Sequence, residues 1–99
     1  MRRGSTPTNE FAVNIDLTGA TVFVTYRQNG KNIVEKTGDD VTITPTKLTV
    51  SLSQEDTLAF TEGKVEMQIR YVFPGGGADA SSIMQTTAER ILKDGVITP

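Results

Sequence analysis

The stretch TVFVTYRQNGKNIVEK, residues 21–36, decides the fold. Its first half alternates strictly between apolar and polar residues, and one face is formed by Val22, Val24 and Tyr26. Alternation with a period of two is typical of a β-strand that has one face buried. The alternation stops at Asn29-Gly30, a dipeptide that tolerates the two positive φ angles of a type I′ turn. The stretch therefore predicts a tight β-hairpin.

The returning strand, NIVEKT (residues 32–37), alternates less cleanly, because Ile33 and Val34 are adjacent apolar residues. Neighbouring side chains in a strand point to opposite faces, so these two cannot both enter one core. This pattern favours an edge strand or a β-bulge over a central strand.

Further segments alternate in the same way on either side of the hairpin, and turn-forming residues separate them. The expected strands are residues 10–15, 41–44, 48–52, 64–73 and 80–87. About seven strands with turns between them predict an all-β fold, an immunoglobulin-like antiparallel β-sandwich. A small antiparallel barrel is the alternative.

One segment breaks the strand pattern and predicts a short helical turn near residues 53–60. Ser53 followed by Glu55 and Asp56 is a helix-start signature, because the serine can cap the helix and the acids favour its N-terminus. Gly63 then leaves room for only one or two turns.

The chain of 99 residues is long enough for one domain and one core. Residues 9–90 are expected to form the sandwich, residues 1–8 an extended N-terminal arm and residues 91–99 a C-terminal tail. The expected core comprises Val22, Val24, Tyr26, Leu48, Val50, Leu52, Val65, Met67, Ile69 and Tyr71.

The composition argues against an enzyme and predicts no cofactor and no catalytic residue. Histidine and cysteine are absent, so the commonest general base, the thiolate nucleophile and the usual transition-metal ligands are missing. Asp39 and Asp40, with Asp16 or Asp79, could supply oxygen ligands to calcium, but no D-x-D-x-D-G spacing is present. Turn chemistry explains the aspartate pair equally well, so we predict that no metal is required.

Charge and hydropathy restrict the partners. The net charge is -2, which gives no basic excess for binding nucleic acid. No apolar run is long enough to span a membrane, and MRRGSTPTNE lacks the apolar stretch of a secretory signal. We therefore expect no nucleic acid, no membrane and no export.

The candidate interface residues lie in two places. The first is the N-terminal arm, with Arg2, Arg3 and Pro7, because Thr6-Pro7 favours an extended path that could add a strand to a neighbouring sheet. We expect deletion of residues 1–8 to leave the melting temperature nearly unchanged and to weaken self-association. The alternative is a disordered terminus, which is the usual state of chain ends.

The second place is the hairpin. Ile33 and Val34 mark the edge that would receive an added strand. Phe23 lies on the face opposite the core, either in a small apolar cluster under a loop or as an exposed contact in an assembly interface.

Residues 15–60, IDLTGATVFVTYRQNGKNIVEKTGDDVTITPTKLTVSLSQEDTLAF, resemble small proteins encoded in the structural gene clusters of tailed bacteriophages and prophages. They are also similar to the N-terminal immunoglobulin-like module of phage baseplate upper proteins, which carries DLTGATV at a strand entry, as residues 16–22 do here, and then an NG or DG hairpin. RGSTPT (residues 3–8) and ILKDGVI (residues 91–97) add to the resemblance. It implies a virion component and names no catalytic residue.

The expected function is that of a non-catalytic phage structural protein of the tail, baseplate or capsid surface. Its expected partners are other virion proteins and further copies of itself, and its expected location is the virion, after synthesis in the bacterial cytoplasm. A bacterial immunoglobulin-like binding or adhesion module is the alternative.

Overall fold

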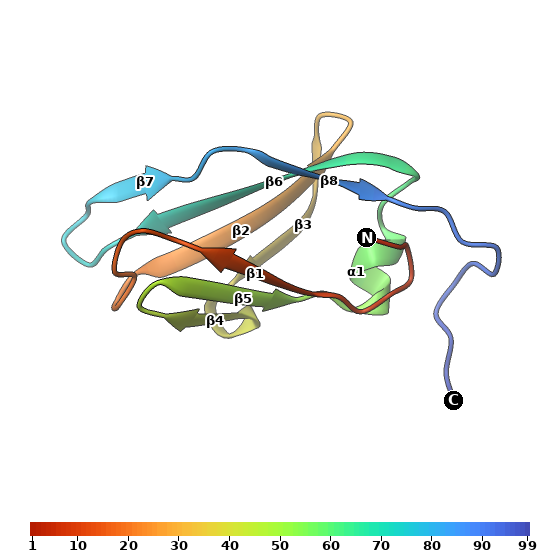
Figure 1. Cartoon of the computed structure of the whole chain (residues 1–99), viewed down its shortest axis with the longest axis horizontal. Coiled ribbons are helices and arrows are strands. Elements are labelled where there is room, and N and C mark those ends of the chain that lie inside the picture. Colours follow the sequence, from red (N-terminus) through yellow and green to blue (C-terminus); the bar gives the residue numbers. More distant parts are fainter.

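The computed structural model describes all residues, 1–99, as two antiparallel sheets packed face to face (Figure 1). The small sheet has the order β1-β5-β4, and the large sheet has the order β3-β2-β6-β7, with β8 also paired to β6. The strands are β1 (Thr8–Ala12), β2 (Thr21–Gln28), β3 (Lys31–Thr37), β4 (Val41–Thr44), β5 (Lys47–Ser51), β6 (Gly63–Val72), β7 (Ala78–Ala80) and β8 (Met84–Ala88). The predicted immunoglobulin-like β-sandwich is confirmed.

The hairpin of β2 and β3 forms as its sequence predicts. Asn29 and Gly30 have φ angles of 52° and 78°, the two positive values that a type I′ turn needs. The register shifts beside Tyr26 and Arg27, where Ile33 falls between the paired residues Asn32 and Val34. This bulge explains the adjacent apolar pair: Val34 turns into the core, while Ile33 is only half-buried. β3 is an edge strand of the large sheet.

The predicted helical turn is α1 (Gln54–Leu58), and its start follows from capping chemistry. The Asp56 N–H donates to the Ser53 hydroxyl at 3.1 Å, and the Ser53 N–H donates to the Asp56 carboxylate at 2.9 Å. This reciprocal pair satisfies two backbone donors that a helix leaves free at its N-terminus. A second short turn, the 3₁₀ helix η1 (Gly38–Asp40), fills the expected turn before β4.

The strand predicted over residues 80–87 is divided in two, because Ser81, Ser82 and Ile83 leave the ladder between β7 and β8. The Ser81 hydroxyl accepts the Ile69 N–H at 3.1 Å, so a side chain takes the place of a backbone carbonyl beside β6. Side-chain hydrogen bonding of this kind competes with regular sheet pairing. The prediction of one continuous last strand is therefore wrong.

Eight of the ten predicted core residues are buried, and two are not. Met67 and Tyr71 are half-buried although they share a face of β6 with Val65 and Ile69. A small sheet of three strands lies against a large sheet of five, so part of the inner face of the large sheet is left partly open. The core also contains residues that alternation alone did not assign, namely Leu17, Val34, Val41, Phe60 and Ala88.

The N-terminal segment does not extend away from the domain. The Glu89 N–H donates to the Met1 carbonyl at 2.8 Å and the Arg3 N–H donates to the Glu89 carbonyl at 3.0 Å, beside an isolated bridge between Arg2 and Glu89. The Leu52 N–H donates to the Pro7 carbonyl at 3.0 Å. The expectation of a free arm is therefore corrected: residues 1–7 cross from the small sheet to β8 and are bonded to both.

Candidate interaction surface

The outer face of the large sheet gathers the side chains that alternate away from the core. On β2 these are Phe23, Thr25 and Arg27, because the intervening residues of the strand are buried. In the sheet register Phe23 lies opposite Arg70 of β6 and Thr37 of β3. Phe23 is 43% exposed, so the interpretation of this residue as an exposed apolar contact fits its position and the small buried cluster does not.

Two shallow hollows mark this outer face. One, of about 460 Å³, is lined by Phe23 together with Val72, Ala78 and neighbouring polar residues. The other, of about 270 Å³, is lined mainly by polar and charged side chains, among them Arg27 and Glu66, with Ile83 at its margin. Both hollows share Thr25, Glu35 and Arg70, so they form one continuous surface, which we call the outer face.

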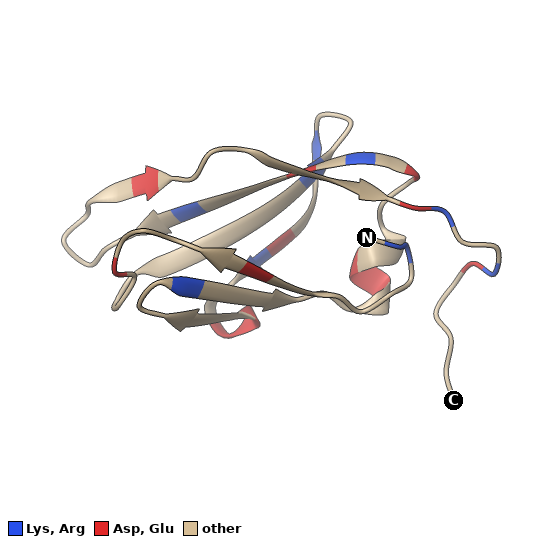
Figure 2. Cartoon of the chain, in the orientation of Figure 1, with Lys and Arg blue, Asp and Glu red and all other residues tan.

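The charges on the outer face are mixed. Arg27 and Arg70 stand among Glu35 and Glu66, and Figure 2 shows acidic and basic positions interspersed along the strands. The Asn32 amide donates to the Glu35 carboxylate at 3.4 Å, and the Arg27 guanidinium donates to the Gly30 carbonyl at 3.1 Å. A surface with both signs and an exposed aromatic ring suits contact with another protein better than contact with a polyanion.

The structure separates the predicted interface residues. Phe23 is on the outer face, whereas Arg2, Arg3 and Pro7 lie with α1 and β8 at the end of the molecule that carries both termini (Figure 1). Val34 is 7% exposed and belongs to the core, which does not fit its assignment to an interface.

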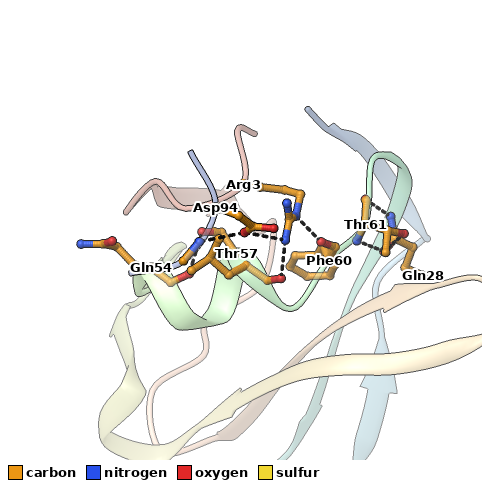
Figure 3. Close-up of polar contacts among 9 residues, drawn as sticks. Arg3, Gln28, Gln54, Thr57, Phe60, Thr61 and Asp94 are labelled. Atoms are coloured by element: carbon orange, nitrogen blue, oxygen red, sulfur yellow. Dashed lines mark hydrogen bonds and ion pairs between the residues drawn. The ribbon is translucent and has the colours of Figure 1, made fainter. Parts of the chain in front are cut away.

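Arg3 is bound within its own domain (Figure 3). Its guanidinium donates to the carbonyls of Phe60 and of Leu58, the latter at 3.0 Å, and lies 3.4 Å from the Asp94 carboxylate. The last carbonyls of a helix lack intrahelical partners and carry partial negative charge, so a cation there stabilises the helix end. The structure therefore gives Arg3 a C-terminal capping role on α1, which the sequence pattern did not indicate.

Two buried polar side chains complete this end of the molecule (Figure 3). Thr57 is fully buried and its hydroxyl donates to the Ser5 carbonyl at 2.8 Å. The Gln28 amide donates to the Thr61 carbonyl at 2.7 Å and accepts the Thr61 N–H at 2.8 Å, so it pairs with the chain as a neighbouring strand would. Both side chains are satisfied, as buried polar groups must be.

Three perturbed groups lie around α1. Burial opposes ionisation of Asp56, but the Lys36 ammonium at 2.8 Å and the Ser53 hydrogen bonds outweigh it and lower the pKa of this carboxyl. Burial raises the pKa of the Tyr26 phenol, although its hydrogen bond from Asn9 acts in the opposite direction. The Gly95 N–H and then Arg3 lower the pKa of Asp94. Each shift has a structural cause in the packing of α1 and the chain ends.

The acidic residues considered for calcium do not come together. Asp39 and Asp40 lie in η1, whereas the Asp16 carboxylate accepts the Thr18 hydroxyl at 2.6 Å and the Thr18 N–H at 2.8 Å, and these two hydrogen bonds lower its pKa. No group of three or more acidic residues is placed to hold a metal ion. No helix combines the length and the apolar character needed to cross a membrane.

A third hollow, of about 570 Å³, was not foreseen from the sequence. It lies between the end of β1 and the β7 edge, and it is lined by Ala12, Val13, Asn14, Ile15, Tyr71, Asp79, Ala80, Ser81 and Ser82. We call it the flank hollow. The only sequence signal for it was Ser81-Ser82, which interrupts the apolar pattern of the last strand.

No protein-family model and no curated protein matches the chain. Among solved structures, the V domain of amphioxus IgVJ-C2 is similar with a TM-score of 0.37 and 12% sequence identity, over 92% of this chain and 97% of that one.

Proposed function

We propose that this chain is a non-catalytic, protein-binding building block that acts through the outer face. The observation that carries the proposal is Phe23, a large aromatic side chain 43% exposed beside a hollow and framed by Arg70 and Glu35. Aromatic and arginine side chains are enriched at the energetic centres of protein interfaces. An exposed ring on a rigid sheet also loses little conformational entropy when a partner covers it.

The assembly in which we place this building block is the particle of a tailed phage, as a tail, baseplate or capsid-surface component. The support is the resemblance of residues 15–60 to small phage structural proteins. A bacterial binding or adhesion module would use the same outer face, and the genes on either side discriminate between the two. Portal, tape-measure or tail genes alongside favour the virion component.

Co-expression with the neighbouring structural genes tests the proposal. Phe23→Asp should abolish co-sedimentation with the assembled particles, because it places a charge at the centre of the contact. Thr42→Asp is the matched control, since Thr42 is exposed on β4 of the opposite sheet. Equal incorporation of the Phe23→Asp variant and the intact protein would contradict the proposal.

A further inference from the structure

The edge strands of the two sheets, β1, β3, β4, β7 and β8, are not equally protected against pairing with another strand. β3 carries the Ile33 bulge and three charged residues, β4 has only four residues and is followed by Pro45, β7 has only three residues, and the end of β8 is bonded to residues 1–3. Bulges, charges, prolines and short length are the devices that keep an edge from receiving a foreign strand. Each of these four edge strands has at least one such device or is covered by another segment.

β1 has no protective device of comparable strength. It pairs with β5 in unbroken register, contains no proline or lysine, and its one charge, Glu10, lies 3.7 Å from Lys47. The Val13 N–H donates to Thr46 across the β5 side, and N–H groups alternate between the two sides of a strand. The N–H groups of Glu10 and Ala12 therefore point to the side of β1 where no strand is paired.

The open side of β1 leads into the flank hollow, which is only partly covered by apolar side chains. Val13 and Ile15, which follow β1, and Tyr71 of β6 line the hollow and are only half-buried. Phe11 of β1, Met67 of β6 and Met84 of β8 are half-buried as well. Residues of both sheets line the hollow, so a single extended segment fits between the two sheets. The edge of a second folded sheet would collide with β7. A strand added here would pair with β1 and cover the inner face that the small sheet leaves open.

The same chain carries a segment with the properties of such a strand. Val96, Ile97 and Thr98 are consecutive β-branched residues, a composition favoured in strands, yet they lie in no strand. Leu92 is 95% exposed, and Val96 and Ile97 are 52% and 56% exposed. The backbone of Ile97 is paired only to a side chain, since its N–H donates to the Gln54 amide oxygen at 2.9 Å and its carbonyl accepts the Gln54 amide N–H at 3.0 Å.

Geometry favours a tail from another copy. Residues 91–98 carry one basic and one acidic residue, Lys93 and Asp94, so the tail has no net charge to oppose its approach to the exposed Asp16 and Asp79 around the hollow. The tail and the hollow lie at opposite ends of the long axis of the molecule, which spans 47 Å (Figure 1). Nine extended residues reach about 30 Å, which suits insertion into an adjacent molecule.

We propose that residues 91–98 of one copy add as a strand to the β1 edge of a second copy and fill its flank hollow. Donor and acceptor lie at opposite ends of the molecule, so the contact is heterologous and extends head to tail into a chain or a closed ring. The proposal does not rest on the outer face, and the two are tested by different variants.

The test uses one donor variant and two acceptor variants. The donor variant lacks residues 91–99. Ala12→Pro removes an N–H from the open side of β1, a position where proline is tolerated, and Asp79→Arg places a much longer side chain in the lining of the hollow. Circular dichroism and urea unfolding verify that each variant is folded. If Ala12→Pro does not fold, Asp79→Arg is used as the acceptor variant instead.

Light scattering over a concentration series should show the intact protein growing in mass, whereas each variant stays monomeric. A mixture of the donor variant with an acceptor variant should form a dimer and no larger species, because one intact tail and one intact hollow remain. Thr42→Asp is the control and should leave self-association unchanged, since Thr42 is exposed on β4, at the opposite edge of the small sheet from β1. An intact protein that stays monomeric, a donor variant that associates like the intact protein, or a mixture without dimer would overturn the proposal.

A synthetic peptide of residues 90–99 gives a second readout with the donor variant as receptor. Calorimetry should detect binding, and hydrogen exchange should show protection of the Ala12 amide. A peptide with Val96→Asp and Ile97→Asp should bind about tenfold or more weakly, since the pockets under alternate side chains discriminate among added strands. Equal binding of the two peptides would overturn the assignment of the tail as the donor.

Discussion

The two ends of the chain lie at the same end of the sandwich but are held very differently. The N-terminal segment is polar and has no apolar face, yet Arg3 and Ser5 bond to α1 and residues 1–3 bond to the end of β8. The C-terminal segment contains Leu92, Val96 and Ile97, yet all three are exposed. Attachment of a chain end to the domain here follows its polar contacts, and apolar content alone does not secure burial.

The largest expected effect comes from removing the two ends separately. Deletion of residues 1–7 should lower the free energy of unfolding by about 3 kcal/mol or more, because it uncovers Thr57, removes the Ser5 acceptor of its hydroxyl and leaves the carbonyls of Leu58 and Phe60 without the Arg3 donor. Deletion of residues 91–99 should cost less than about 1 kcal/mol. Urea unfolding of both truncated proteins measures the difference. Equal losses in the free energy of unfolding would contradict the view that the two ends are held differently.

Single substitutions of the two adjacent arginines test which contacts hold the N-terminal segment. Arg3→Met keeps most of the side-chain volume but removes the donors to α1, and it should cost about 1–3 kcal/mol. Arg2→Met removes an exposed ion pair with Glu89 and should change stability by less than about 0.5 kcal/mol. Thermal unfolding of the two variants compares them, and an Arg2 effect as large as that of Arg3 would refute the capping role.

The pH dependence of stability tests α1, which both ends contact. The pKa of Asp56 is lower in the folded chain than its ordinary value of 3.8, so the unfolded chain binds this proton more readily. The stabilisation is therefore complete above that value and is lost as the pH falls through the folded pKa. Asp56→Asn should flatten the pH dependence of the free energy of unfolding below about pH 4. Unfolding of the variant and the intact protein between pH 2 and pH 6 checks this, and identical slopes would contradict it.

The smallest effect is expected at Asp94, the contact through which the two ends touch. Its carboxylate is exposed and its ion pair with Arg3 spans 3.4 Å, so solvent screens the attraction. Asp94→Asn should leave the melting temperature unchanged within error, at low and at high salt. A clear fall restricted to low salt would show that the C-terminal segment contributes to the order of the N-terminal one.

The sequence determined most of the strands, the β2–β3 hairpin and the start of α1, because each depends on residues close together in the chain. Alternation selects a buried face in β2, Asn29-Gly30 selects the turn, and Ser53 with Asp56 forms the cap locally. Phe23 was placed on the face away from the core by the same reasoning, since a period of two fixes the side of a strand on which a residue lies, and its exposure was decided by the structure.

The tertiary structure alone decided the roles of Arg3, Met67 and the flank hollow. Arg3 bonds to carbonyls more than fifty residues away, and no local pattern encodes that contact. Met67 has the alternation of a core residue, but its burial depends on how many strands the opposite sheet contains. Sequence periodicity fixes the face of each strand, whereas coverage of that face is a property of the whole assembly of strands, and this is why both the open flank and its edge became visible only in three dimensions.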